Sequence, residues 1–114
     1  KRAAKAAVVL GEFGVRDNGD NQLSNSDTTQ WSATDVAWLG WLATYTRGQL
    51  GAQRSWMWWA YNANSGDTRG IVGPSTTWRE VQWTKVRFLA KNFGLQPWYC
   101  AAGTKSLARK YGCA

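Results

Sequence analysis

The chain has 114 residues, enough for one small domain with a modest hydrophobic core. Fourteen Lys and Arg against seven Asp and Glu give a net charge of +7, but the basic residues are scattered, which argues against a nucleic-acid-binding protein. His is absent, no Cys/His spacing is typical of a metal site, and no apolar run is long enough to cross a bilayer, so we expect no metal, no cofactor and no membrane span.

The first predicted element is a strand over residues 6–13. This segment is an apolar run broken only by Gly11 and Glu12, the pattern of a strand buried on both faces. The chain starts with neither Met nor a signal peptide, which indicates a processed or excised piece. Residues 16–30 are rich in Asp, Asn, Ser and Gly and predict a long loop.

The next predicted element is a helix that begins at Ser32, because Ser32 and Asp35 form a Ser-x-x-Asp capping box. Four large side chains then recur with the spacing of one apolar helix face. They are Trp38, Trp41, Leu42 and Tyr45. Gly48 and Gly51 are expected to end this helix.

Residues 55–62, SWMWWAYN, predict a second strand, and the polar sequence of residues 64–67 predicts a turn after it. Because side chains alternate along a strand, Trp59 should share a face with Met57 and Tyr61, while their neighbours face the helices. The chain has nine Trp, four Tyr and three Phe. This content fits a core rich in Trp, which the helical and strand patterns favour, or a surface that stacks on sugar rings.

A second helix is predicted after another capping box, formed by Thr77 and Glu80. Its expected apolar face is made of aromatic and aliphatic residues: Trp78, Val81, Phe88 and Leu89. Asn92 and Gly94 supply the stop, and the tail after Pro97 is irregular.

The order strand, helix, strand, helix predicts a parallel α/β arrangement. Two strands cannot make a self-sufficient parallel sheet, because each face and each edge needs cover. The chain therefore either pairs with another copy or fragment, or belongs to a larger barrel.

Cys100 and Cys113 enclose a short loop near the C-terminus. The pair is compatible with a disulfide formed in an oxidising compartment and also with two free thiols, and the spacing does not decide between them. We interpret the pair as a disulfide that closes the tail, with no redox role.

Two segments resemble the cellulases of glycoside hydrolase family 5. Residues 8–14, VVLGEFG, are similar to the Gly-Glu-Phe-Gly end of that family's seventh strand. Residues 56–72, WMWWAYNANSGDTRGIV, are similar to its eighth strand and following loop, and a Trp-x-x-Val-x-x-x-Lys pattern ending at Lys85 agrees with its last helix. The resemblance covers residues 7–89, and Arg69 departs from it by standing where the family has Gly.

The resemblance implies an α/β fold made of the last two βα units, strands 7 and 8, of a (β/α)8 TIM barrel, which is incomplete on its own. Residues 1–95 would be the C-terminal portion of this glycoside hydrolase barrel, and residues 96–114 its disulfide-closed tail. The implied activity is that of a secreted, extracellular, retaining endo-β-1,4-glucanase that hydrolyses β-glucan or cello-oligosaccharides.

By resemblance Glu12 is the catalytic nucleophile; from the residues alone, a strand-end Glu paired with an Arg is the simpler interpretation. A retaining glycosidase also needs a second carboxylate as acid/base. The family's Asn-Glu pair that carries it is absent, as are its His, Arg and Tyr from earlier strands, and Glu80 belongs to the predicted helix cap. We therefore expect the chain alone to be inactive and to need a complementary N-terminal polypeptide of the barrel.

Trp59 aligns with the family's sugar platform, where an indole stacks on a pyranose ring and removes its C–H face from water. A core Trp is the alternative for this position. Asn64, in the following turn, is a second candidate substrate contact, and Arg69 is expected to narrow the cleft or to change which sugar fits it.

Two other functions stay open. The chain is a non-catalytic carbohydrate-binding or structural subunit derived from the same fold if Glu12 has no role in binding or activity. A basic structural protein that associates with nucleic acid is the remaining alternative, and steep loss of binding with salt would identify it.

Overall fold

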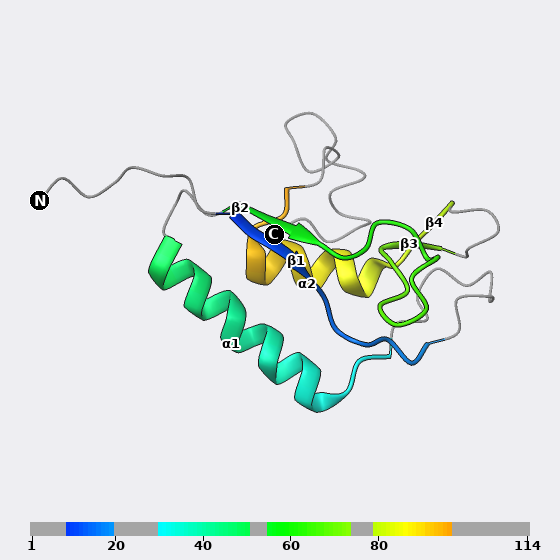
Figure 1. Cartoon of the computed structure of the whole chain (residues 1–114), viewed down its shortest axis with the longest axis horizontal. Helices are drawn as coiled ribbons and strands as arrows, with labels where there is room; N and C mark the ends of the chain where they lie inside the picture. Colours follow the sequence, from blue (N-terminus) through cyan, green and yellow to red (C-terminus); the bar gives the residue numbers. More distant parts are fainter. Residues whose placement is uncertain (1–8, 20–29, 51–54, 74–78, 97–114) are drawn as a thin grey trace, which may run out of the picture.

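The computed structural model describes residues 9–19, 30–50, 55–73 and 79–96 (Figure 1). These residues form two helices and four strands in the order β-α-β-β-β-α. The elements are β1 Val9–Phe13, α1 Ala33–Leu50, β2 Ser55–Trp58, β3 Val72–Gly73, β4 Glu80–Val81 and α2 Trp83–Phe93. The described part is therefore a small mixed α/β structure with two two-stranded sheets.

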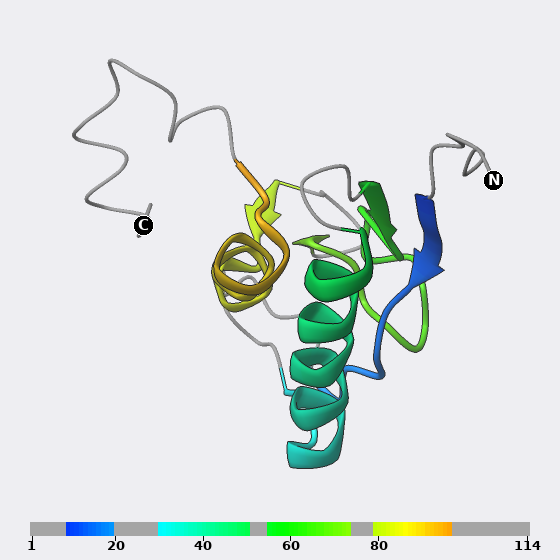
Figure 2. The same cartoon turned by 90° about the vertical axis from the view of Figure 1, so that its left-hand side faces the viewer.

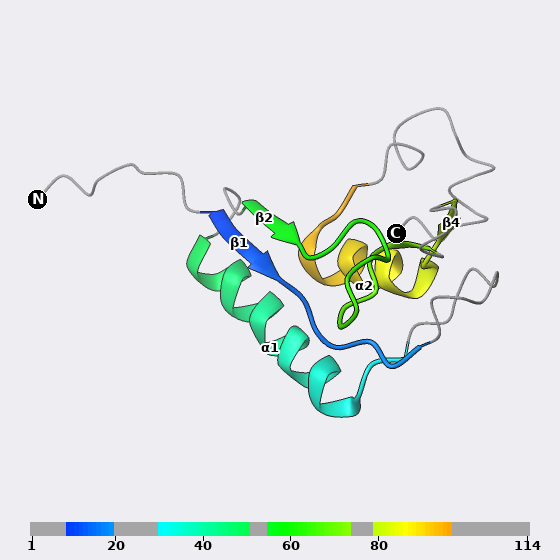
Figure 3. The same ribbon diagram turned by 45° about the vertical axis from the view of Figure 1, so that its right-hand side comes forward.

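Strands β1 and β2 lie side by side and run parallel, and α1 belongs to the connection between them. The pairing runs from Val9–Ser55 to Phe13–Trp58, and one extra residue of β1, Gly11, interrupts the register. Figure 3 shows both strands pointing the same way, so their carboxyl ends lie on the same side of the molecule. One parallel β-α-β unit of the predicted kind is thus present.

Both helices lie on one side of the β1–β2 pair (Figure 2). Their apolar side chains meet those of β1 and of the chain just after it in a single core, made of Phe13, Val15, Leu39, Leu42, Ala43, Leu89 and Phe93. Trp56 and Trp58 of β2 pack against this core, each edge-to-face with Phe13 at ring-centroid distances of 6.1 and 5.2 Å. No element among the described residues covers the opposite face of the pair.

Helix α1 begins where the sequence predicts. The Asp35 N–H donates to Ser32 Oγ at 3.1 Å and the Ser32 hydroxyl donates to Asp35 Oδ2 at 2.6 Å, which confirms the local cap. Gly48 does not end the helix, which continues to Leu50, the residue directly before the other predicted stop, Gly51. One Gly in a helix costs only about 1 kcal/mol relative to Ala, which packing elsewhere along α1 offsets.

The aromatic face predicted for α1 is not the face that packs. Of its four residues only Leu42 is buried, while Trp38, Trp41 and Tyr45 are exposed, Trp41 to 60%. Trp41 and Tyr45 stack on each other, with ring centroids 5.3 Å apart and planes 17° apart. The buried face consists of smaller side chains: Leu39, Leu42, Ala43 and Thr46.

The second predicted strand is shorter than residues 55–62, since β2 ends at Trp58. Beyond it the Trp59–Ala60 peptide bond is cis. The chain then meets the start of β3, because the N–H of Val72 donates to the Tyr61 carbonyl at 2.8 Å. The turn predicted over residues 64–67 is confirmed.

The second predicted capping box is wrong. Glu80 lies in β4, which pairs antiparallel with β3, and Thr77 lies outside the described residues. Helix α2 begins only at Trp83, so Val81 is not part of it. Of the predicted face, Leu89 is buried and Phe88 packs partly buried against the core, and the buried face also includes Lys85, Val86 and Phe93. Gly94 ends it in the left-handed conformation, with φ of 72°, which confirms the predicted stop.

Candidate functional site

Glu12 lies on the uncovered face of the β1–β2 pair. In the parallel register Glu12 is opposite Met57 and Phe13 is opposite Trp58. Phe13 and Trp58 contact each other on the helix side, so alternation directs Glu12 and Met57 to the other face, where both are exposed. Within the described part of the chain Glu12 has no ion pair, so the Arg-paired alternative finds no support there.

Trp59 is the first residue after β2. Its backbone N–H donates to the Phe13 carbonyl at 2.8 Å, so the segments that continue β1 and β2 stay paired beyond the end of β2. Trp59 is 47% exposed and Tyr61 is 72% exposed, whereas Ala60 between them is buried. Exposure alternates here as the sequence predicts, although β2 ends at Trp58, and the interpretation of Trp59 as a core residue is wrong.

The backbone of Trp59 also packs directly against Gly14, the second Gly of the Gly-Glu-Phe-Gly segment. A Cβ atom at Gly14 would overlap the Trp59 carbonyl oxygen and lie 3.1 Å from the Thr68 methyl carbon. Only Gly allows this close approach of the chains that leave β1 and β2. The motif therefore has a packing reason in addition to carrying Glu12.

The indole of Trp59 is tied to the turn that follows. Its Nε1–H donates to Ser65 Oγ at 3.2 Å, and the Ser65 hydroxyl donates to Asp67 Oδ1 at 2.5 Å. Asp67 Oδ1 also accepts the Thr68 N–H at 2.7 Å. The Ser65 hydroxyl and this backbone N–H hold the pKa of the Asp67 carboxyl below its ordinary value.

Asn64, the other candidate substrate contact, is exposed in the same turn. Among the described residues no hydrogen bond connects its side chain to Glu12 or Trp59. Ser65, which the sequence analysis did not single out, is the turn residue that contacts the indole.

A buried ion pair joins helix α2 to the loop after β1. Lys85 Nζ and Asp17 Oδ2 are 2.6 Å apart, and their side chains are 0% and 3% exposed. The ammonium group also donates to the carbonyls of Thr68 and Gly70, both at 2.8 Å, so its three donors are all used. Burial lowers the pKa of Lys85, and the hydrogen bond and charge of Asp17 oppose this shift.

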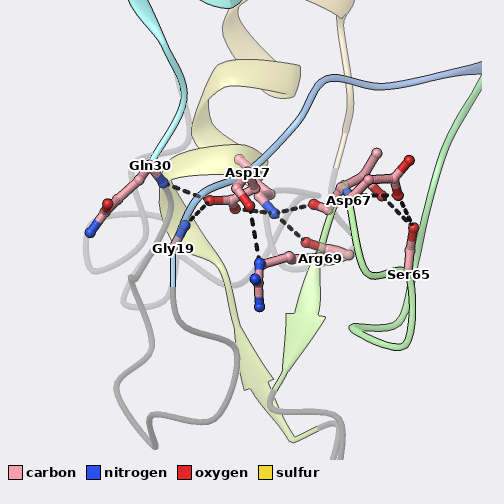
Figure 4. Close-up of polar contacts among 9 residues, drawn as sticks. Asp17, Gly19, Gln30, Ser65, Asp67 and Arg69 are labelled. Carbon is pink, nitrogen blue, oxygen red and sulfur yellow. Dashed lines mark hydrogen bonds and ion pairs between the residues drawn. The ribbon is translucent and has the colours of Figure 1, made fainter.

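Asp17 is the point where the two loops at the carboxyl ends of β1 and β2 are joined (Figure 4). Asp17 Oδ1 accepts the N–H groups of Gly19 and Gln30, both at 2.8 Å. Its own N–H donates to the Asp67 carbonyl at 2.8 Å, and its carbonyl accepts Arg69 Nε–H at 3.0 Å. We refer to the buried Asp17–Lys85 pair with these bonds as the loop clamp.

Arg69 is part of the loop clamp, because its Nε–H donates to the Asp17 carbonyl, so its side chain points toward the loop after β1. It adopts a positive φ of 58°, a conformation in which a Cβ atom is disfavoured. The expectation that Arg69 shapes a sugar cleft stays untested, because the contact found is with the backbone of Asp17.

Two substitutions at Arg69 separate its hydrogen bond from its backbone conformation. Arg69→Ala and Arg69→Gly both lose the bond to Asp17, but only Ala keeps a Cβ atom at positive φ. We expect Arg69→Gly to be the more stable variant by about 1 kcal/mol in the free energy of urea unfolding. Equal stabilities, or a more stable Ala variant, would contradict the backbone conformation seen here.

The loop clamp was missed from sequence because its partners are far apart along the chain. One signal was available: Lys85 is in phase with Leu89 and Phe93 on the buried face of α2, where an unpaired Lys would be costly. Asp17 gave no signal, because it stands in a stretch full of polar loop residues.

The described residues contain no group of three or more acidic, Cys or His side chains that could hold a metal ion. No helix among them is long and apolar enough to span a membrane. Cys100 and Cys113 lie outside the described residues, as does the proposed tail beyond Gln96. No protein-family model matches the chain.

Proposed function

We propose that this chain is the C-terminal portion of the (β/α)8 barrel of a retaining endo-β-1,4-glucanase, similar to those of glycoside hydrolase family 5. The observation that carries the proposal is the uncovered face of the parallel β1–β2 pair. It presents Glu12 near the carboxyl end of β1 and the exposed Trp59 just after β2, while both helices lie on the opposite face. In a (β/α)8 barrel the helices lie outside the strands and the catalytic groups lie at the carboxyl ends of the strands, and this arrangement agrees with both features.

In this proposal Glu12 attacks the anomeric carbon and forms a covalent glycosyl intermediate, which water then hydrolyses. The attack needs a second carboxyl group about 5–5.5 Å away to protonate the leaving oxygen. The other carboxylates of the described residues are engaged elsewhere: Asp17 with Lys85, Asp35 with Ser32 and Asp67 with Ser65. Glu80 lies in β4, outside the β1–β2 pair. The proposal therefore takes the acid/base from the N-terminal part of the barrel, as the missing Asn-Glu pair implies.

The uncovered surfaces support a complementary N-terminal polypeptide as that partner. Strand β1 has only β2 as a neighbour among the described residues. On α1 the exposed stripe of Trp38, Trp41 and Tyr45 is distinct from the flank that faces α2, where Arg47 donates to the Asn92 carbonyl at 3.2 Å. Preceding βα units would pair with the free strand edge and cover the aromatic stripe.

Secretion and a disulfide between Cys100 and Cys113 belong to the same proposal, because endoglucanases of this kind act on extracellular polysaccharide. Asn64 is retained as a candidate contact to β-glucan, since it is exposed in the turn that holds Ser65.

Complementation tests the proposal. The chain is co-expressed with a polypeptide that supplies the first six βα units and the acid/base Glu. We expect the pair to co-purify and to hydrolyse soluble β-glucan with retained anomeric configuration, followed by NMR of the first products, and we expect neither part to be active alone. Inverted products, or no association of the two parts, would refute it.

A non-catalytic carbohydrate-binding subunit is the second candidate, and the exposed rings of Trp59 and Tyr61 favour it. Stacking on sugars needs these rings and no carboxylate. In that case Glu12→Gln would leave cello-oligosaccharide binding unchanged, and the complemented pair would show no hydrolysis.

A further inference from the structure

The hydroxyl of Ser65 stands between an indole and a carboxylate, and its single proton can be placed by elimination. The Asp67 carboxylate only accepts hydrogen bonds, so Ser65 must donate its proton across the 2.5 Å contact. Indole Nε1–H only donates, so Trp59 must direct its proton to a lone pair of Ser65. The Thr68 hydroxyl, 3.1 Å away, donates to the other lone pair.

This chain of hydrogen bonds has one direction, from the indole through Ser65 to the charge on Asp67. A hydroxyl that donates to a carboxylate becomes a better acceptor, because its oxygen gains negative charge. The bond from Trp59 is therefore stronger than an isolated indole–hydroxyl contact at the same 3.2 Å distance.

Asp67 is itself fixed to the loop clamp. Its side chain accepts the Thr68 N–H and its carbonyl accepts the Asp17 N–H at 2.8 Å. The carbonyl of Thr68 in turn accepts a hydrogen bond from the buried Lys85 ammonium. The exposed indole is thereby connected, through the Ser65 hydroxyl, the Asp67 carboxylate and the backbone of Thr68, to the fully buried Lys85 ammonium.

We propose that Ser65 and Asp67 are positioning residues that fix the ring plane of Trp59, so that the indole presents one face to a sugar ring. A half-exposed Trp has few contacts to select its rotamer, and its N–H bond supplies the missing constraint. The preset ring loses less conformational entropy when a pyranose stacks on it. The sugar as ligand rests on the proposed endoglucanase function, whereas the orientation of the ring does not.

The arrangement also sets how the ring responds to acid. Because the pKa of Asp67 is lowered, the carboxylate keeps its charge at pH values below the ordinary titration range of an Asp. The hydrogen bonds that orient the indole are therefore lost only as the pH falls through that lowered pKa. Arg16, on the loop after β1, is the charged side chain that adds to the lowering. Protonated Asp67 gains a donor of its own and no longer directs the Ser65 proton.

The test follows the Trp59 indole N–H of the full chain by ¹⁵N NMR, with Ser65→Ala, Ser65→Thr, Asp67→Asn and the control Ser55→Ala. We expect Ser65→Ala to shift this signal and to speed its exchange with water on the order of tenfold, since the N–H is then open to solvent. Ser65→Thr keeps the hydroxyl and should restore the wild-type signal. Asp67→Asn should give an exchange rate between those of the wild type and Ser65→Ala. It should also abolish an acid titration of the indole signal that, in the wild type, lies below the ordinary range of an Asp.

An unchanged indole signal in both Ser65→Ala and Asp67→Asn would overturn the positioning role. A measurement of KM then distinguishes the positioning of the ring from the proposed endoglucanase function. In the complemented enzyme Ser65→Ala should raise KM for cellotetraose several-fold with kcat nearly unchanged, because the platform binds a sugar and takes no part in bond cleavage. If the indole is released but KM is unaffected, the ring is positioned as proposed and the assignment of Trp59 as a sugar platform fails.

Discussion

Glu12→Gln should lower the β-glucan hydrolysis rate of the complemented enzyme on the order of ten-thousand-fold, and leave its folding intact. An amide of the same shape cannot attack the anomeric carbon, and loss of a covalent nucleophile has effects of this size or larger. The described structure gives Glu12 no ion pair, and its side chain is exposed. We therefore expect the free energy of unfolding to change by less than about 0.5 kcal/mol.

Asp35→Asn is the matched control for this change, since it removes one carboxylate charge at the start of α1, away from the β1–β2 face. It should weaken the helix cap by about 1 kcal/mol and leave hydrolysis at the wild-type rate.

A covalent label identifies the nucleophile independently of the rate. A 2-deoxy-2-fluoro cellobioside with a good leaving group accumulates the glycosyl intermediate, and mass spectrometry should find the sugar on the peptide that holds Glu12. Hydrolysis that persists in Glu12→Gln, or a label on another residue, would remove Glu12 from the mechanism.

The features that could be predicted from sequence are those that depend on neighbouring residues. The cap at Ser32, the stop at Gly94 and the turn at residues 64–67 each use contacts within a few positions, so a short pattern contains their full cause. The alternation of exposure within β2 was predicted for the same reason, because the period of a strand is a local property.

The errors arose where distant partners decide the structure. Glu80 fitted a capping box, but its segment pairs with β3 instead. On α1 the large rings formed the most apolar stripe, yet Leu39 and Ala43 face the core. The apolar face of a helix does not by itself identify the element that it packs against. In a chain that we propose to be part of a barrel, some apolar faces would be covered only by strands and helices of the rest of that barrel.

The candidate site divides in the same way. Glu12 and Trp59 were reached through motif resemblance. The parallel register of β1 and β2 directs Glu12 to the exposed face with Met57, and the exposed Trp59 follows directly after β2. The groups that hold their loops, Asp17 and Lys85, are joined only in three dimensions. The chemistry of a site is therefore easier to predict from this sequence than the scaffold that fixes its geometry.

Lys85→Met should destabilise the chain by about 3–5 kcal/mol, measured by urea unfolding followed with Trp fluorescence. Met fills a similar volume, so the cost comes from electrostatics more than from a cavity. The substitution leaves the buried Asp17 carboxylate without its cation and frees the carbonyls of Thr68 and Gly70, and breaking a buried pair from one side has costs of this size. Small domains have total stabilities of about 5–15 kcal/mol, so the variant loses a large part of its stability.

Two further variants show whether the pair, and not helix propensity or net charge, causes the loss. Lys91→Met removes an exposed Lys from the last turn of the same helix and should cost less than about 1 kcal/mol. Asp17→Asn keeps an acceptor for the N–H groups of Gly19 and Gln30 while removing the charge. Combined with Lys85→Met it leaves no buried ion, so the double variant should be less destabilised than the sum of the two single changes by more than 1 kcal/mol. Additive costs would mean that Asp17 and Lys85 act separately, and the loop clamp would then not be the unit that joins the two loops.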